Sequence, residues 1–360
     1  MALRGAIIGL GNVAVHGHLP GWLARKDVEI VAATDISPAR EAEMRRHLPG
    51  ARWYPNVDAL WAGEPLDFVD ICTPPGTHAA LVRGALEGGR HVLCEKPLVT
   101  RPDDLEELAG LAAAHDRVLH TVHNWHHAPV VRRVTALLHE GAIGEVRSCT
   151  WHTLRAQPAG SGAAGAASWR VDPALAAGGI LVDHGWHAFY IVQAWLGRAP
   201  TRVCARLETR RHTEWPLEDT ALIHLEYPQA RAEILLTWAA DERRNWARLE
   251  GTRGVILVED DAVALAAPGF REGGRRWPCP PALSSGSYHP DWFGAVADAF
   301  VGEVTGRAET RGQNLEEAAL CAILVAAAQA SHRQGGVWLP VAGPRPLAAA
   351  RGSGAAGRRR

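Results

Sequence analysis

The chain has 360 residues, 47% of them hydrophobic, and a formal net charge of −1 at pH 7. This length predicts two domains, because single cores rarely grow beyond about 250–300 residues. A net charge near zero argues against a nucleic-acid or membrane-surface partner, and no apolar run reaches the roughly 20 residues that a membrane span requires.

The first predicted element is a short apolar strand at residues 6–8, which runs into Gly-Leu-Gly-Asn-Val-Ala at residues 9–14. In a strand–turn–helix unit, such glycines permit a tight turn and let the backbone approach a dinucleotide pyrophosphate at the helix N-terminus. The residues predicted to bind a dinucleotide here are Gly9, Gly11, Asn12, Val13 and Ala14.

A second predicted strand covers residues 28–33 and is followed by Asp35. An acidic side chain about 20 residues after the glycine turn accepts hydrogen bonds from the adenosine ribose hydroxyls. It also repels a 2′-phosphate, so we expect NAD rather than NADP, although Arg40 lies close to it in the sequence. The alternative role for Asp35 is to cap a helix beside Ser37.

The rest of the first half alternates predicted strands with predicted helices. The strands cover residues 68–72, 91–94 and 118–122, and the helices cover 77–87 and 104–115. This rhythm predicts a doubly wound parallel sheet, in which ligands bind beyond the carboxyl ends of the strands. Further residues at these ends are predicted to contact the cofactor: Thr73, Pro74, His78, Glu95 and Lys96.

Lys96 is one of only two lysines in the chain, the other being Lys26, and it follows a predicted strand in the sequence Glu-Lys-Pro. Arginine always stays charged, whereas a lysine ammonium can be desolvated until it exchanges protons near neutral pH. A lysine at this position, in a chain that otherwise uses arginine, indicates a need for a transferable proton. The alternative is a surface lysine that caps a strand end.

After residue 124 the alternation stops. Predicted strands cover residues 145–154, 202–209, 220–226, 231–237, 248–250 and 254–259, and predicted helices cover 130–140, 179–196 and 314–333. Several strands alternate apolar and polar residues, which predicts a large, mostly antiparallel sheet with one open face that can serve for dimerisation. We therefore expect domains at 1–124 and 125–347, a mobile loop at 158–167 and a disordered tail at 348–360.

The helix at 179–196 carries the second group of candidate catalytic residues. Asp183 and His187 stand four residues apart and are therefore expected on one helix face. A neighbouring carboxylate orients an imidazole and stabilises its charged form, which suits a general base. Gly178 and Gly179 leave room for a ligand near the helix start. The alternative is a self-paired Asp–His on an amphipathic helix.

Taken together, the glycine turn, Asp35, Glu95-Lys96-Pro97 and the Gly-Gly…Asp-x-x-x-His helix resemble the glucose–fructose oxidoreductase/inositol dehydrogenase/rhizopine catabolism (Gfo/Idh/MocA) family over about residues 3–340. The resemblance implies a Rossmann domain, an α/β domain with a large open sheet, and a homodimer or homotetramer. It implies NAD(P)-linked hydride transfer to or from a sugar, cyclitol or related polyol. The catalytic set that it implies is Lys96, Asp183 and His187.

One segment departs from the family pattern. The family often has Asn-Arg-Arg-x-x-Pro where this chain has Asn-Trp-His-His-Ala-Pro at residues 124–129, so the substrate of close relatives does not carry over. The aromatic stretch at 284–293 has no predicted role. The residues predicted to bind the substrate are Lys96, Asn124, Trp125, Arg155, Asp183, His184 and His187.

Other functions remain open at this point. The chain has 18 histidines, including His123 and His127 at helical spacing, but it lacks a His-Glu-x-x-His motif and we predict no metal. A glycosidase that uses NAD for transient oxidation fits the same residues, as does a non-catalytic dinucleotide-sensing regulator. The six cysteines form no Cys-x-x-Cys pair, which indicates free thiols and a cytoplasmic location.

Overall fold

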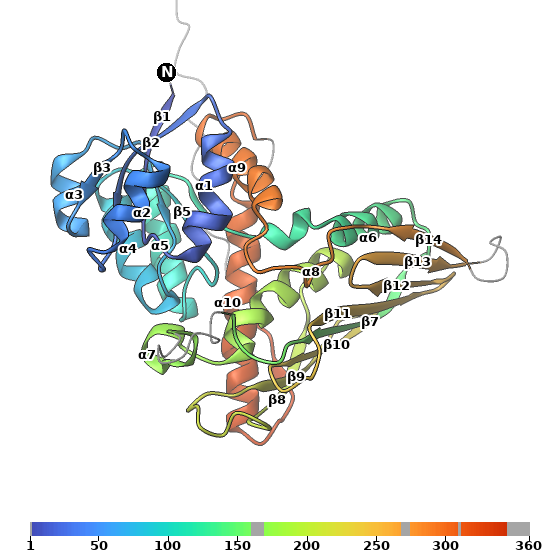
Figure 1. The fold of residues 1–360 in the computed structure, drawn as a ribbon. Helices are drawn as coiled ribbons and strands as arrows, with labels where there is room; N and C mark the ends of the chain where they lie inside the picture. The colour runs from blue at the N-terminus through green and yellow to red at the C-terminus, as the bar shows by residue number, and fades with distance from the viewer. Residues whose placement is uncertain (1, 160–168, 268–273, 309–310, 344–360) are drawn as a thin grey trace, which may run out of the picture.

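The computed structural model describes residues 2–159, 169–267, 274–308 and 311–343 (Figure 1). Most of the predicted loop at 158–167 and all of the predicted tail at 348–360 lie outside the described residues. Within the described ranges, no helix has the length and apolar character needed to cross a membrane.

The first half forms a six-stranded parallel sheet in the order β3-β2-β1-β4-β5-β6. Its strands are β1 (Leu3–Ile8), β2 (Val28–Thr34), β3 (Arg52–Tyr54), β4 (Phe68–Ile71), β5 (His91–Cys94) and β6 (Leu119–Thr121). Its helices are η1 (Ala14–His18), α1 (Leu19–Leu23), α2 (Arg40–His47), α3 (Val57–Gly63), η2 (Pro75–Thr77), α4 (His78–Glu87) and α5 (Pro102–Ala114). The strand order reverses beside β1, which is where such sheets bind dinucleotides.

The two faces of this sheet bury separate apolar clusters. Successive residues of a strand point to opposite faces, so Ile8 and Val69 belong to one cluster while Ile7 and Phe68 belong to the other. A strand buried on both faces must be apolar throughout, which explains the uninterrupted apolar runs in the sequence. The predicted doubly wound parallel sheet is confirmed.

The second half forms a nine-stranded sheet in the order β14-β13-β12-β11-β7-β10-β9-β8-β15. Its strands are β7 (Val146–Leu154), β8 (Arg202–Glu208), β9 (Thr220–Glu226), β10 (Arg231–Thr237), β11 (Arg244–Gly251), β12 (Val255–Glu259), β13 (Ala262–Ala266), β14 (Arg275–Pro278) and β15 (Leu339–Pro340). Only β7 and β10 pair in parallel among these strands of the described chain.

Helices cover one face of this sheet. They include α6 (Pro129–His139), α8 (Trp186–Leu196) and α10 (Gln313–Arg333), which lie on the same side in Figure 1. Along β7, Cys149, Trp151 and Thr153 are buried and the residues between them are partly exposed. This alternation is the one expected of a sheet covered on one side, and it confirms the predicted open, mostly antiparallel sheet.

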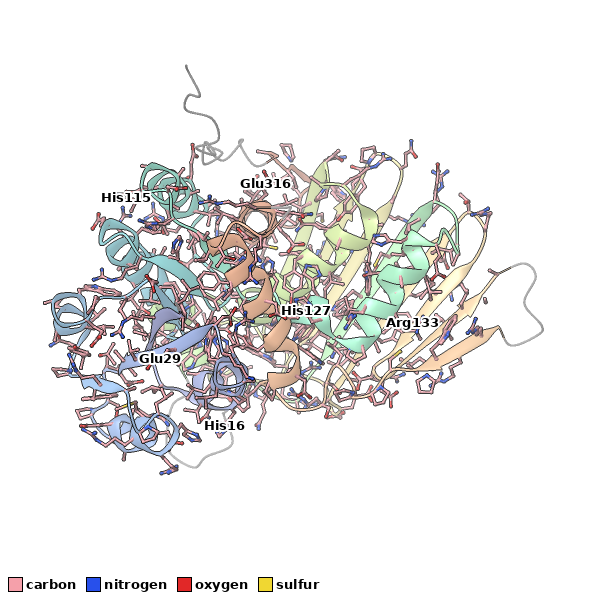
Figure 2. The ribbon with its side chains drawn as sticks, turned by 90° about the horizontal axis from the view of Figure 1, so that it is seen from above. His16, Glu29, His115, His127, Arg133 and Glu316 are labelled. Carbon is pink, nitrogen blue, oxygen red and sulfur yellow. The ribbon has the colours of Figure 1, made fainter. Side chains whose placement is uncertain are left out.

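The C-terminal helices tie the two sheets together. Helix α9 (Pro290–Val304), which was not predicted, packs on η1 and α1, and α10 contacts α5 and β6 on one side and α8 and β8 on the other. Seen from above, these helices lie at the join between the two halves, where Glu316 and His127 are labelled (Figure 2). Gly21 makes room for α9, because a Cβ there would lie 2.6 Å from the Phe293 ring.

Candidate functional site

Lys96 stands just beyond β5 and reaches across to the second half of the chain. Its Nζ donates hydrogen bonds to the carbonyl oxygen of Asp183 at 2.8 Å and to Asp183 Oδ1 at 2.9 Å. An ammonium has three N–H donors, so these bonds leave one for a ligand. The Lys96–Pro97 peptide bond is cis.

Asp183 lies on η5 (Leu181–Gly185), a π-helical turn that leads into α8. His184 Nδ1 lies 3.2 Å from its Oδ2, and Arg170 Nε lies 3.8 Å from the same oxygen. Burial works to raise the pKa of Asp183, but Lys96, His184 and Arg170 hold it well below its usual range. The carboxylate is therefore ionised at neutral pH.

Gly179 allows the chain to approach Glu218 closely at the start of this helix. A Cβ on Gly179 would lie 1.9 Å from the Glu218 carbonyl oxygen. Glu218 Oε1 accepts hydrogen bonds from the N–H groups of Gly179 at 2.9 Å and Leu181 at 3.2 Å. Glu218 thus caps the start of this helix. No sequence motif pointed to Glu218, because it lies far from Gly179 along the chain.

His187 is buried against Trp125, with ring centroids 4.2 Å apart and an angle of 9° between the ring planes. Its Nδ1 lies 2.8 Å from Tyr190 Oη, which also accepts the Trp125 N–H at 3.0 Å. Burial, followed by the charges of Lys96 and His184, lowers the pKa of His187 well below 6.5. The imidazole is therefore neutral at neutral pH.

The expected pairing of Asp183 with His187 is wrong. The Asp183 carboxylate contacts Lys96 and His184, whereas the His187 ring bonds to Tyr190. In an α-helix, residues four apart lie on one face. The wider turn of the π-helix at Leu181–Gly185 rotates Asp183 and His187 away from that arrangement. Tyr190 was overlooked, although its position three residues after His187 places it on the same face of α8.

The glycine turn and Asp35 meet at the carboxyl ends of β1 and β2. Asp35 Oδ2 accepts the Leu10 N–H at 2.7 Å, and Oδ1 accepts the Ser37 N–H at 2.8 Å. Gly9 has a φ of +89°, whereas a Cβ on Gly11 would meet no atom within 4 Å. Gly11 therefore faces open space, which leaves room for a pyrophosphate to approach the backbone. Asn12 is exposed, Val13 is half-buried and Ala14 is buried.

His78 joins the two loops that follow β4 and β5. Its ring nitrogens lie 2.7 Å from the Pro97 carbonyl oxygen and 2.8 Å from that of Thr73. Burial lowers its pKa, so the ring is neutral and its single N–H donates to one of the two carbonyls. His78 thus holds the loop with Thr73 and Pro74 beside Lys96, and its contacts lie within the protein. Glu95 is also buried, and its Oε2 accepts the Lys96 N–H at 2.9 Å.

Of the remaining predicted substrate residues, Asn124 and Trp125 lie on η3 (Asn124–His127) and His184 lies beside Asp183. Burial lowers the pKa of His184 to about 4. The Asn124 Oδ1 atom is buried and has no partner among the described residues. Arg155 is 1% exposed, and its Nη1 donates to the carbonyl oxygens of Leu154 and Arg244. These contacts hold Arg155 between β7 and β11.

His123, His126 and Glu317 lie close enough together to hold a metal ion. However, Trp186 Nε1 donates to His123 Nε2 at 2.9 Å, so the proton of a neutral His123 ring sits on Nδ1 and points at Glu317, 2.5 Å away. His126 Nε2 lies 3.0 Å from the same carboxylate. These contacts favour hydrogen bonds that join η3 and its N-cap residue His123 to α10 over a metal centre.

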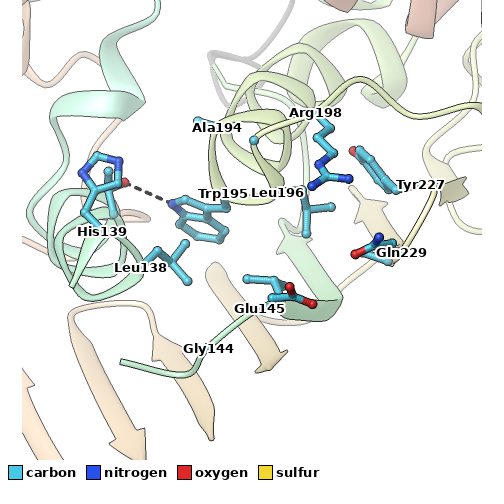
Figure 3. Close-up of a pocket in the computed structure, with 14 residues that line it drawn as sticks. Leu138, His139, Gly144, Glu145, Ala194, Trp195, Leu196, Arg198, Tyr227 and Gln229 are labelled. Atoms are coloured by element: carbon cyan, nitrogen blue, oxygen red, sulfur yellow. Dashed lines mark hydrogen bonds between the residues drawn. The ribbon is translucent and has the colours of Figure 1, made fainter. Parts of the chain in front are cut away.

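A surface cavity of about 330 Å³ lies between α6, the end of α8 and the turn between β9 and β10 (Figure 3). Trp195, Arg198 and Gln229 are among its lining residues, and none of the predicted site residues is. The site that the sequence predicts is instead the junction of the two domains around Lys96 and Asp183.

Comparisons with known proteins match both halves of the chain to one family. Residues 3–123 match the oxidoreductase family with an NAD-binding Rossmann fold, and residues 131–257 match the GFO/IDH/MocA C-terminal domain. A D-glucoside 3-dehydrogenase of Escherichia coli is 30% identical over 189 residues, 51% of each chain. An NADP-dependent D-xylose 1-dehydrogenase of Haloferax volcanii is 31% identical over 200 residues, 55% of this chain and 58% of that one.

The chain spans less than two thirds of the length of the first curated relatives that it matches. Among solved structures, levoglucosan dehydrogenase in complex with NADH and levoglucosan superposes with a TM-score of 0.81 at 20% identity, covering 95% of this chain and 100% of that one. At this identity the likeness shows the fold alone. Both domains match one family, and the chain therefore belongs to the Gfo/Idh/MocA family of oxidoreductases.

Proposed function

We propose that this protein is an NAD-dependent dehydrogenase that transfers hydride between a hydroxyl carbon of a sugar, cyclitol or related polyol and the nicotinamide. One observation carries the proposal: the Lys96 ammonium and the Asp183 carboxylate form an ion pair across the two domains, next to a neutral, buried His187. The E. coli and Haloferax relatives are named as sugar dehydrogenases, which supports this substrate class.

Asp35 supports NAD as the cofactor. Its carboxylate stands at the end of β2 beside the glycine turn, where it would accept the ribose hydroxyls and repel a 2′-phosphate. Gly9, Gly11 and the start of η1 would hold the pyrophosphate. The loop with Thr73 and Pro74, fixed by His78, would flank the nicotinamide. Bound NAD would supply the hydride acceptor.

In the oxidative direction, the third N–H of Lys96 donates to the substrate oxygen and stabilises the developing alkoxide. Asp183 orients the ammonium. The hydroxyl proton would go to His187 Nε2, while bound NAD would accept the hydride of the carbinol carbon. This assignment places the proton of neutral His187 on Nδ1, which donates to Tyr190 Oη. A phenol oxygen has two lone pairs and can accept this bond together with the Trp125 N–H.

The open face of the second sheet supports assembly as a homodimer or homotetramer. A row of half-buried side chains crosses four neighbouring strands there, with Leu222 paired to Leu235, Leu235 to His152 and His152 to Trp246. Burying such a row against a second copy would remove apolar surface from water. Leu235→Arg should shift the mass measured by light scattering towards the monomer, and an unchanged mass would contradict this interface.

The test of the function is NADH formation across a panel of inositols, free sugars, sugar phosphates and nucleotide sugars. We expect stoichiometric NADH with at least one member, and loss of that activity in Lys96→Met. Release of free sugar from a glycoside without net NADH would instead indicate an NAD-dependent glycosidase. Binding of NAD with no turnover on any member would indicate a dinucleotide-sensing regulator.

A further inference from the structure

His18 makes contacts that the mechanism above does not use. It ends η1, the π-helical turn that follows the glycine turn, and is 2% exposed. Figure 2 marks this turn with His16. His18 Nδ1 lies 2.9 Å from Asp70 Oδ2, and Nε2 lies 3.0 Å from Glu95 Oε1. A carboxylate only accepts, and a neutral imidazole has one N–H, so only an imidazolium donates to both.

The surroundings of His18 fit a charged ring. Asp70 is fully buried and also accepts the Trp22 Nε1–H at 2.7 Å. The Phe293 ring of α9 stacks on His18 at 4.0 Å and brings no charge. Burial opposes the charged form, but the Asp70 carboxylate raises the pKa of His18 well above 6.5. Two carboxylates thus share one buried cation.

A metal ion would be the other way to satisfy this group, because His18, Asp70 and Cys72 lie within ligand distance of one another. A metal binds the thiolate form of cysteine. Burial raises the pKa of Cys72 to about 12, which favours the thiol in the metal-free protein. Trp22 already occupies Asp70 Oδ2. The contacts therefore favour a protonated histidine.

Glu95 links His18 to Lys96 by contacting both residues. One carboxylate oxygen, Oε1, faces His18, and the other, Oε2, accepts the backbone N–H of Lys96 at 2.9 Å. Burial acts to raise the pKa of Glu95, but His18 and Lys96 hold it below its usual range. The Glu95 carboxylate thus contacts His18 through one oxygen and the Lys96 backbone through the other. The Lys96 side chain in turn contacts Asp183.

We propose that His18 is a positioning residue that stays an imidazolium. Through Glu95 it fixes the Lys96 backbone, so that the Lys96 ammonium can reach the substrate. The inference rests on the role proposed for Lys96. Without the cation, Asp70 and Glu95 would be two buried carboxylates without a shared partner, and they would repel each other.

The charge on His18 can be tested without any substrate. In protein labelled with ¹⁵N-histidine, both ring nitrogens of His18 should remain protonated to pH values well above 6.5. The signal is assigned by its loss in His18→Gln. Loss of one ring proton near pH 6.5 in the wild-type protein would overturn the inference.

The link to Lys96 requires kinetics with the polyol that the panel identifies. His18→Gln and Glu95→Gln should each lower kcat by up to about 10²-fold, as expected when a catalytic group is displaced by about 1 Å. The double variant should be no slower than the slower single variant, because both changes break one link. If the two losses in kcat multiply in the double variant, or if His18→Gln keeps the wild-type kcat, the inference is overturned.

His120→Gln is the matched control. His120 is a buried histidine of the same domain whose Nδ1 lies 3.0 Å from Glu303 Oε1, and it has no contact with Glu95. We expect a lower melting temperature and an unchanged kcat. A fall in kcat equal to that of His18→Gln would show a merely structural effect. If the wild-type protein reduces NAD with none of the polyols in the panel, the proposed function fails. The NMR titration still decides the charge on His18.

Discussion

Lys96 Nζ lies 2.9 Å from Asp183 Oδ1 and 2.8 Å from the carbonyl oxygen of the same residue. The two residues come from different domains and are 15% and 12% exposed in their side chains. This ion pair therefore spans the junction at which the substrate is expected, and it aims the remaining N–H of the ammonium.

Asp183→Asn should slow turnover while leaving the fold in place. The amide retains an oxygen for Lys96 but removes the charge that orients the ammonium, so we expect kcat to fall by about 10²-fold. The measurement is steady-state NADH formation together with the far-UV circular dichroism spectrum. Asp172→Asn is a useful control, because Asp172 caps the Ala174 N–H on nearby α7 (Pro173–Ala176) and should leave kcat unchanged.

The pH profile should report the lowered pKa of His187. A base that must be unprotonated loses activity as the pH falls through its pKa, so the acid limb of kcat/KM should lie well below pH 6.5. Asp183 stays ionised over this range because its pKa is also well below its usual value. An acid limb centred at or above pH 6.5 would contradict the role of His187.

Asp35→Asn should weaken the preference for NAD. Removing the negative charge removes the repulsion of a 2′-phosphate, so the ratio of kcat/KM for NADP to that for NAD should rise at least about tenfold, or roughly 1.4 kcal/mol. Ser37→Ala is the control, since only the backbone N–H of Ser37 contacts Asp35. An unchanged ratio in Asp35→Asn would remove Asp35 from cofactor selection.

Gly179→Ala should destabilise the protein, because its Cβ would lie 1.9 Å from the Glu218 carbonyl oxygen. Since the clash is with backbone, we expect a loss of about 1–3 kcal/mol in the free energy of unfolding. Gly110→Ala on α5, where a Cβ would meet no atom within 4 Å, should instead be neutral or stabilising. Equal melting temperatures for the two variants would show that Glu218 does not restrict this position.

Local patterns in the sequence predicted most of the fold. Apolar strands and intervening helices were readable in both sheets because each leaves its own periodicity, but strands β3, β13, β14 and β15 were not predicted. Helix α9 was missed although Pro290 and Asp291 at its start are a helix signal. Its preceding residue, His289, has a φ of +44° and makes no side-chain cap, so the usual capping residue was missing.

The site was predictable only in part. A motif and a spacing argument singled out Lys96, Asp183 and His187 as candidates, and the structure brings Lys96 and Asp183 together, but their other partners were not predicted. Tyr190 was within reach of the same spacing argument. Glu218 and His18 act through contacts with segments far away in the sequence, such as Gly179 and Glu95. Those pairings follow from how the sheets and helices pack, and no local pattern records them.

The central claim is that Lys96 and His187 act on one alcohol carbon beside the nicotinamide. The most direct measurement is the single-turnover rate of NADH formation by wild-type protein and Lys96→Met at saturating NAD, with the polyol deuterated or not at the reacting carbon. We predict slower NADH formation from the deuterated polyol in the wild type, and a further fall of about 10²–10⁴-fold in Lys96→Met with NAD affinity retained. A folded Lys96→Met protein with the wild-type single-turnover rate would contradict the account.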